Sequence, residues 1–101
     1  MKLKFTPSAR GQFLDGIEYI TEDNPLAAQR VKVKVEKALT RLLTFPTSGR
    51  KIPEFPELPH RELVVSPYRI FYRVEGEVLW VVAVWHSSQS PKTPEAKLAC
   101  T

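Results

Sequence analysis

Two copies of one helix-start signal constrain the fold of this chain more than any other feature. Thr6-Pro7 and Asn24-Pro25 each place a side chain that can cap a helix directly before a proline that fits the first helical turn. Apolar residues recur at helical spacing after each signal: Ala9, Phe13, Ile17 and Ile20 after the first, then Ala28, Val31, Val35, Ala38, Leu39 and Leu42 after the second. Because the link between the two helices is so short, the pattern predicts an antiparallel helix hairpin.

The rest of the chain predicts a small sheet. Lys2–Phe5 is a short strand candidate before the first helix, and three further strands are expected at Arg61–Val65, Arg69–Glu75 and Val78–Trp85. Phe45 to Pro59 is expected to be a loop, and residues 87–101 a polar tail. The predicted fold is α+β, in the order β-α-α-β-β-β. It is one domain over residues 1–101, with the helix hairpin on one face of a mainly antiparallel sheet.

The last hairpin predicts which strand residues share a face. A two-residue turn at Glu75-Gly76 or at Gly76-Glu77 pairs odd-numbered residues with even-numbered ones, and paired residues share a face. One predicted face is apolar and should lie under the helices: Ile70, Tyr72, Val74, Leu79, Val81, Ala83 and Trp85. The other mixes cations, a histidine and aromatic residues, and should bind a macromolecule: Arg69, Phe71, Arg73, Glu75, Val78, Trp80, Val82, Val84 and His86.

The net charge of +4 is concentrated in one part of the chain. Residues 25–51 contain seven basic residues and one acidic residue. Four of the cations, Arg30, Lys34, Lys37 and Arg41, lie within about 60° of one another on the second helix. This basic ridge predicts a polyanion or an acidic protein as partner. The alternative is an ordinary solvated helix face.

Other features exclude several functional classes. The longest apolar run, Val78 to Trp85, is far shorter than the ~20 residues that span a bilayer, and no apolar signal stretch follows Met1. The single cysteine, Cys100, has no partner for an internal disulfide. We therefore expect a cytoplasmic protein that has no membrane contact. No metal-ligand cluster, glycine-rich phosphate loop or serine–histidine–aspartate set is present, so no cofactor and no metal are expected.

The candidates for chemistry lie on the mixed face of the sheet. His86 is the side chain that can exchange a proton near neutral pH, and Arg69 stands with it as the candidate catalytic pair of a metal-free ribonuclease. Glu62, Tyr68 or Tyr72 could supply a second proton-transfer group. Candidate residues for binding a nucleic acid or another target are Arg61, Arg69, Phe71, Arg73 and Trp80, with Arg50 and Lys51 at a flexible basic tip. The structural alternatives are an ion pair of Arg69 with a glutamate and a backbone hydrogen bond at His86.

Several short stretches, taken in order, resemble the RelE/ParE toxin superfamily over nearly the whole chain. They are Glu18-Tyr19-Ile20 through Asp23-Asn24-Pro25-Leu26-Ala27-Ala28, Ser48-Gly49-Arg50, Arg61-Glu62-Leu63, Pro67-Tyr68-Arg69-Ile70-Phe71-Tyr72-Arg73-Val74 and Val84-Trp85-His86. The resemblance implies the toxin of a type II toxin–antitoxin pair. It also implies a cognate antitoxin whose acidic C-terminal segment wraps the toxin, and binding to operator DNA only through that antitoxin.

Two mechanisms occur in this superfamily. RelE-like members cut mRNA on the ribosome, and the resemblance places Arg69 and His86 at positions that serve this cleavage. ParE-like members poison DNA gyrase. Ser87 and Ser88 stand where the nucleases often have arginine or tyrosine, and the stretch from Asn24 to Ala28 is closer to the ParE-like branch. The sequence therefore favours gyrase as target, with ribosome-dependent mRNA cleavage as the alternative. A third hypothesis is a small nucleic-acid-binding module without toxicity.

Overall fold

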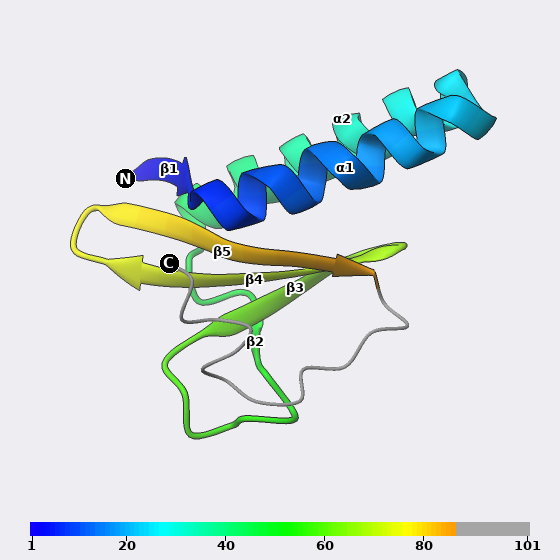
Figure 1. Cartoon of the computed structure of the whole chain (residues 1–101). Coiled ribbons are helices and arrows are strands. Elements are labelled where there is room, and N and C mark those ends of the chain that lie inside the picture. The colour runs from blue at the N-terminus through cyan, green and yellow to red at the C-terminus, as the bar shows by residue number, and fades with distance from the viewer. Residues whose placement is uncertain (87–101) are drawn as a thin grey trace.

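The computed structural model describes residues 1–86 as two helices packed on a five-stranded sheet (Figure 1). The elements in chain order are β1 Lys2–Phe5, α1 Pro7–Asp23, α2 Pro25–Thr44, β2 Arg50–Lys51, β3 Arg61–Val65, β4 Tyr68–Glu75 and β5 Val78–His86. The predicted α+β class and element order are confirmed. The expected tail, 87–101, lies outside the described residues.

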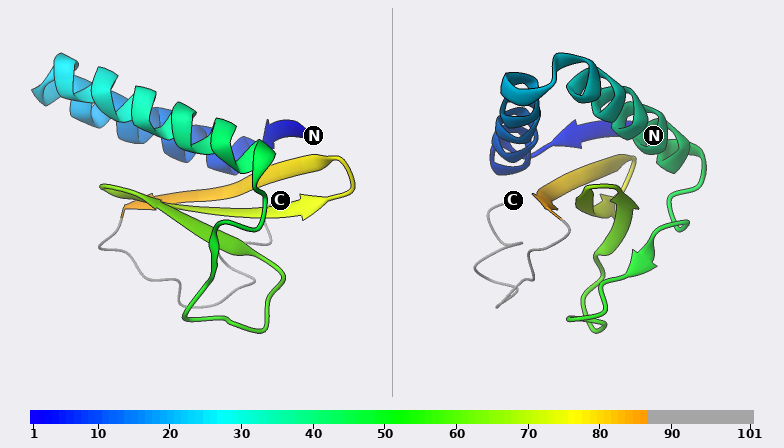
Figure 2. Two further views of the ribbon diagram at one scale, coloured as in Figure 1. Left: turned by 180° about the vertical axis from the view of Figure 1, so that it is seen from behind. Right: turned by 90° about the vertical axis from the view of Figure 1, so that its right-hand side faces the viewer.

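Both helices begin at the predicted capping residues. The Thr6 Oγ1 accepts a hydrogen bond from the Ala9 N–H at 3.1 Å, and the Asn24 Oδ1 accepts one from the Ala27 N–H at 3.1 Å. Asn24 is also the residue at which α1 ends, so a single residue separates the two helices. The helices therefore run antiparallel, side by side above one face of the sheet (Figure 2). Neither helix is long and apolar enough to cross a membrane.

The strand order in the sheet is β1-β5-β4-β3-β2. β1 pairs in parallel with β5 at one edge, and the remaining neighbours are antiparallel. β2 falls inside the segment that the sequence predicts as loop; it has only two residues and pairs with Arg61 and Glu62 at the start of β3. The turn between β4 and β5 is Gly76-Glu77, because Glu75 pairs with Val78 and Gly76 takes the positive φ of 59°.

The main hydrophobic core lies between the helices and the sheet. α2 contributes Val35, Leu39 and Leu42, and the sheet contributes residues such as Ile70 and Leu79, all of them buried. These are the apolar residues that the helical and strand patterns place on facing surfaces. The core therefore fixes the helix hairpin on one side of the sheet and leaves the other side to the segment between α2 and β3.

Candidate functional site

A β-bulge in β5 changes which residues reach the second face of the sheet, away from the helices. Next to the turn the ladder is regular, and Tyr72 pairs with Val81. Phe71 then pairs with Ala83, so Val82 is an extra residue in β5. Val82 and Ala83 both join the hydrophobic cluster on the second face. Beyond this point, each residue of β5 faces the side opposite to the one that the sequence predicts.

The predicted faces are therefore right throughout β4 and in β5 as far as Val82, and wrong in β5 beyond it, although Val74, expected under the helices, is 44% exposed. Ala83 and Trp85 were expected under the helices but lie on the second face, packed with Phe71. Val84 was expected on the second face but packs in the main core. His86 pairs with Tyr68, another main-core residue, and so shares the helix side of the sheet. The cause is one inserted residue, which reverses the alternation of side chains.

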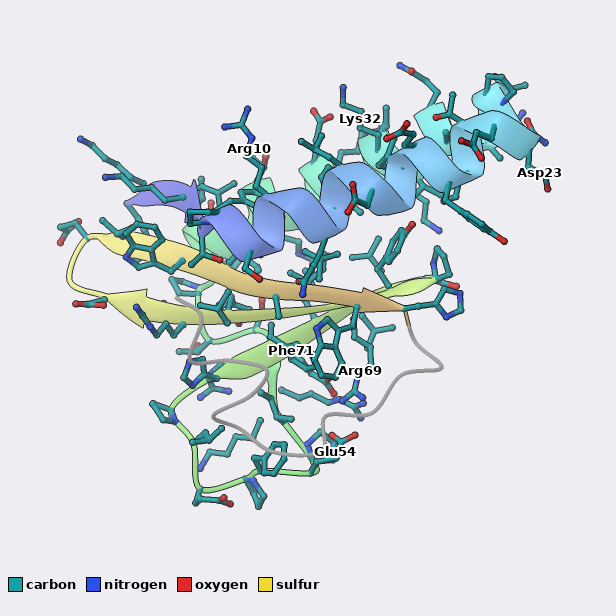
Figure 3. All side chains as sticks on the ribbon, in the orientation of Figure 1. Arg10, Asp23, Lys32, Glu54, Arg69 and Phe71 are labelled. Atoms are coloured by element: carbon teal, nitrogen blue, oxygen red, sulfur yellow. The ribbon has the colours of Figure 1, made fainter. Side chains whose placement is uncertain are left out.

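Arg69 lies at the centre of an ion-pair network on the second face. Its Nε donates to the Glu62 Oε2 at 2.8 Å, and its two terminal nitrogens donate to the Glu54 carboxylate at 3.0 and 2.9 Å. The other Glu62 oxygen accepts from the Arg50 Nε at 2.6 Å. Arg69 is only 8% exposed and its guanidinium lies 5.1 Å from the centre of the Phe71 ring. The structural alternative, an ion pair with a glutamate, is thus the arrangement observed (Figure 3).

The electrostatics of the network follow from these contacts. The Arg69 guanidinium donates hydrogen bonds to Glu54 and lowers the pKa of that carboxyl group below its ordinary value. The same hydrogen bonds, which Arg69 donates to Glu54, raise the pKa of Arg69. Glu62 is only 1% exposed. Its buried negative charge is stable there because Arg50 and Arg69 both form ion pairs with it.

The second face is covered by the chain's own segment between β2 and β3. Ile52 is fully buried, and Phe55 and Leu58 pack with it against Phe71, Val82, Ala83 and Trp85. Phe71 and Trp85 meet edge to face, with ring centres 5.6 Å apart. Figure 1 shows this segment on the side of the sheet opposite the helices. The expectation of an open aromatic surface is therefore wrong at Phe71, because the apolar side chains of this loop fill it.

Other candidate binding residues remain accessible around this covered centre. The Arg50 side chain is 63% exposed, and Lys51 beside it is also exposed. Arg61 is half-buried and donates to the Gly49 carbonyl at 2.8 Å. Arg73 is half-buried and pairs with the exposed Glu75 at 3.2 Å, and Lys4 lies over the half-buried Trp80 ring at 5.7 Å. Arg50 and Arg73 therefore border the second face, whereas Lys51 and Arg61 pair with each other and, through Tyr72, belong to the helix side of the sheet.

The structure separates the two candidate catalytic residues. His86 is exposed at the end of β5, and its ring meets the Tyr68 ring edge to face with centres 6.4 Å apart. Burial raises the pKa of the Tyr68 hydroxyl. Arg69 pairs with Trp85 and lies on the opposite face of the sheet from the His86–Tyr68 pair. The sequence argument that placed Arg69 and His86 on one face is therefore wrong.

The basic ridge of α2 has the arrangement that the sequence predicts. All four of its cations, Arg30, Lys34, Lys37 and Arg41, are exposed. None of them forms an ion pair with an acidic side chain among residues 1–86. Within that part of the chain there is also no group of three or more histidine, cysteine or acidic residues that could hold a metal ion. The ridge is the largest concentration of accessible positive charge on the helices.

The sequence analysis missed two features of the surface. One is the role of Glu54, whose position among prolines gave no periodic signal. The other is an apolar groove of about 670 Å³ lined mainly by Leu3 and Phe5 of β1, Phe13 of α1, and Val35 and Leu39 of α2. The apolar stripes of both helices face the core. The groove lies where the short β1 leaves part of that apolar surface uncovered.

Comparisons with known proteins agree with this architecture. Residues 3–91 match the family described as the ParE toxin of the type II toxin–antitoxin system parDE. Toxin RelE2 of Caulobacter vibrioides is 34% identical over 73 residues, which are 71% of this chain and 78% of that protein. A solved structure titled as the chromosomal ParDE toxin–antitoxin system from P. aeruginosa matches with a TM-score of 0.67 at 18% identity. The match covers 85% of this chain and 95% of that chain, and supports the fold.

The family match extends over most of the chain, from β1 past the end of β5. The relative from Caulobacter vibrioides supports the same assignment at the level of sequence. A toxin of this class has a cognate antitoxin as its partner. The chain belongs to the ParE toxin family, within the RelE/ParE superfamily, and is the toxin component of a type II toxin–antitoxin system.

Proposed function

We propose that this toxin acts on DNA gyrase as a binding protein, without catalytic chemistry of its own. The observation that carries the proposal is the separation of Arg69 and His86 on opposite faces of the sheet. A ribonuclease needs its proton-transfer group and its phosphate-binding cation around one scissile phosphate. Arg69 is in addition engaged by two carboxylates, so a phosphate would have to compete with Glu54 and Glu62.

The accessible cations around the second face are the proposed contacts with gyrase. Arg50 on β2 and Arg73 on β4 lie on the second face, because their ladder partners are Glu62 and Trp80, and the exposed Lys51 follows Arg50 along the chain. Exposed cations at a rim contribute to association rate and specificity more than a buried, paired cation does. The proposed site of action is the cytoplasm, where gyrase and DNA are present.

The proposed antitoxin contact is the basic ridge of α2. Its four cations are exposed and form no ion pair among residues 1–86, so an acidic segment would gain several favourable charge interactions there. We propose that the acidic C-terminal segment of the antitoxin lies along this ridge. Operator DNA would then be bound by the antitoxin and not by the toxin directly.

The second candidate function is ribosome-dependent mRNA cleavage. It is favoured by one local arrangement, the exposed His86 imidazole beside the Tyr68 ring, which could supply proton transfer at the end of the sheet. Arg69 could assist such a site only from the other face. The two candidate functions therefore make opposite predictions for a substitution at His86.

Incubation of the purified toxin with gyrase and supercoiled plasmid tests the first proposal. We expect trapped, cleaved DNA or blocked supercoiling, with the same potency for wild type and His86→Ala. Arg73→Glu, which reverses a charge on the second face, should weaken the effect. In parallel, primer extension on a translated message should show no toxin-dependent cleavage. Message cleavage that His86→Ala abolishes, together with unimpaired gyrase, would replace the gyrase proposal with the nuclease.

A further inference from the structure

The two edges of the sheet differ in how their free backbone groups are satisfied. β1 covers only the first part of β5, and Thr6 and α1 add contacts along the same edge. The Thr6 N–H donates to the Val81 carbonyl at 3.0 Å, and the Val84 N–H donates to the Gln12 Oε1 at 2.8 Å. At the opposite edge, β2 pairs only with Arg61 and Glu62. Leu63–Val65 therefore has no strand on its outer side among residues 1–86.

Val64 presents its backbone groups at this open edge. A Cβ added to Gly49 would come within 2.8 Å of the Glu62 carbonyl oxygen, so the Glu62 peptide groups point toward the β2 side. Alternate residues of a strand direct their N–H and C=O to the same side, which places those of Val64 on the outer edge as well. No backbone or side-chain hydrogen bond within the described part of the chain uses them. The Val64 side chain is 52% exposed.

Among residues 1–86, Leu63–Val65 has none of the usual protection against pairing with another strand. Natural edge strands carry charged side chains, prolines or bulges, or are covered by other elements. Leu63, Val64 and Val65 are three apolar residues in regular pairing with β4. An unprotected edge of this kind is a binding site for an extended chain, whose backbone completes the ladder.

Positive charge borders the edge on both sides. A small hollow lined by Arg41, Ala38, Leu42, Ser48 and Leu63 lies between α2 and β3. A second hollow is lined by Arg50, Glu62 and Val64 together with Ser48, Gly49 and Leu63. Arg41 and Arg50 are both exposed, and the Glu62 carboxylate is already bound by two arginines. An added strand would pass between these cations, with the rest of the basic ridge beyond Arg41.

We infer that the open edge of β3 accepts an extended acidic segment of a partner protein as an additional strand. Its backbone pairs with the N–H and C=O of Val64, and its carboxylates meet Arg41 on one face and Arg50 on the other. The inference deepens the proposed contact with an acidic antitoxin segment and rests on it, but does not depend on gyrase. A second copy of this chain would bring a second Arg41 and Arg50 to the same place. A nucleic acid has no peptide backbone to complete the ladder.

Nuclear magnetic resonance of the full-length protein with synthetic peptides tests the inference. The probe is a capped nine-residue peptide that alternates valine with glutamate, and its matched control alternates valine with lysine. We expect the glutamate peptide to shift the Val64 amide resonance and to slow its hydrogen exchange, and the lysine peptide to do neither. Val64→Pro removes the outward N–H without removing a β3–β4 hydrogen bond, and should weaken binding about tenfold.

Charge reversal on α2 tests whether the glutamate peptide binds beside the β3 edge or responds only to the overall positive charge of the protein. Arg41→Glu should weaken the glutamate peptide at least about fivefold, because it replaces attraction with repulsion beside the strand. Lys32→Glu makes the same change in charge on the same helix, but lies roughly 180° from Arg41 around the helix axis and should change affinity less than about twofold. Thermal unfolding of each variant checks that it remains folded.

Four results would overturn the inference. The first is a Val64 amide that the glutamate peptide leaves unchanged, and the second is equal binding of the lysine peptide. The third is slower hydrogen exchange at the Val64 amide as protein concentration rises without peptide. The fourth is slower hydrogen exchange at the Val64 amide on addition of a DNA or RNA oligonucleotide. The third result would assign the edge to a second copy of this chain. The fourth would assign it to nucleic acid. Failure in the gyrase assay leaves the peptide result unchanged, so the two proposals fail independently.

Discussion

Residues on the two faces of the central strands are buried by different means. On the helix side, Ile70 and Leu79 lie under α1 and α2, whose apolar stripes match the faces that they cover. On the second side, Phe71 and Val82 lie under a segment with little regular structure, which contributes Ile52, Phe55 and Leu58. The first cover is fixed by helix geometry and the second by a few side chains and the Arg69 network. The second cover is therefore the part of the fold that single substitutions should release most selectively.

The largest expected effect is at Glu62, which connects the two arginines of the network. Glu62→Gln removes a buried carboxylate and leaves the mostly buried Arg69 with Glu54 as its remaining acidic partner in the network. Removing one member of a buried ion pair costs about 3–5 kcal/mol of unfolding free energy. Urea unfolding measures this loss. The matched control, Glu75→Gln, breaks the more exposed pair with Arg73 and should leave the unfolding midpoint nearly unchanged.

A paired truncation compares the two covers directly. Ile52→Ala in the loop and Leu42→Ala in α2 each remove a fully or almost fully buried aliphatic side chain. Each should lower the free energy of unfolding by about 2–5 kcal/mol. Hydrogen exchange should distinguish them, with Ile52→Ala exposing amides of the loop and Leu42→Ala weakening the whole domain. If Ile52→Ala costs nothing, the second cluster is not a core, and the contrast between the covers disappears.

The sequence predicted the helices that cover one face of the sheet much better than the loop that covers the other face. Helix starts depend on adjacent residues, so Thr6 and Asn24 could be identified as caps from local spacing alone. The bulge at Val82 could not be identified, because two small apolar residues in an apolar strand carry no sign of an insertion. Pairing counted from the turn gives the right faces only in an unbroken ladder, and Trp85 and His86 therefore lie on the faces opposite to those predicted.

The candidate site was harder to predict because its parts come from separate segments. Arg69 could be identified as a site residue, and an ion pair with a glutamate as its alternative. The choice between them depends on where the loop carries Glu54, which lies among prolines with no helical or strand period. Ile52, Phe55 and Leu58 likewise have irregular spacing, so the cover of the second face gave no pattern before the structure.

A smaller effect is expected where the segment between α2 and β2 is attached to the sheet through Tyr72. Its buried hydroxyl donates to the Pro46 carbonyl at 2.7 Å and accepts from the Gly49 N–H at 3.0 Å. Tyr72→Phe leaves both backbone groups without this partner, which should cost about 1–3 kcal/mol. Thermal unfolding measures the loss. Tyr19→Phe is the matched control, because the Tyr19 side chain is largely exposed and the same change there should have little effect.

The smallest expected effect is a pH dependence at the end of the loop, at His60. Burial, and secondarily the positive charge of Arg73, lower the pKa of His60 below its ordinary value of 6.5. Its Nδ1 is buried and has no hydrogen-bond partner among residues 1–86. The unfolded chain therefore binds a proton at His60 more readily than the folded chain does. The contribution to stability is complete above pH 6.5 and is lost as the pH falls through the folded-state pKa.

Urea unfolding of wild type and His60→Gln between pH 7.5 and pH 5 measures this contribution. Wild type should lose stability over this interval, and the variant, which cannot take up the proton, should lose less. His86→Gln replaces the other histidine among the described residues and is measured in parallel as the comparison variant. Equal slopes for wild type and His60→Gln would show that His60 contributes nothing to the pH dependence of stability, and would contradict the prediction.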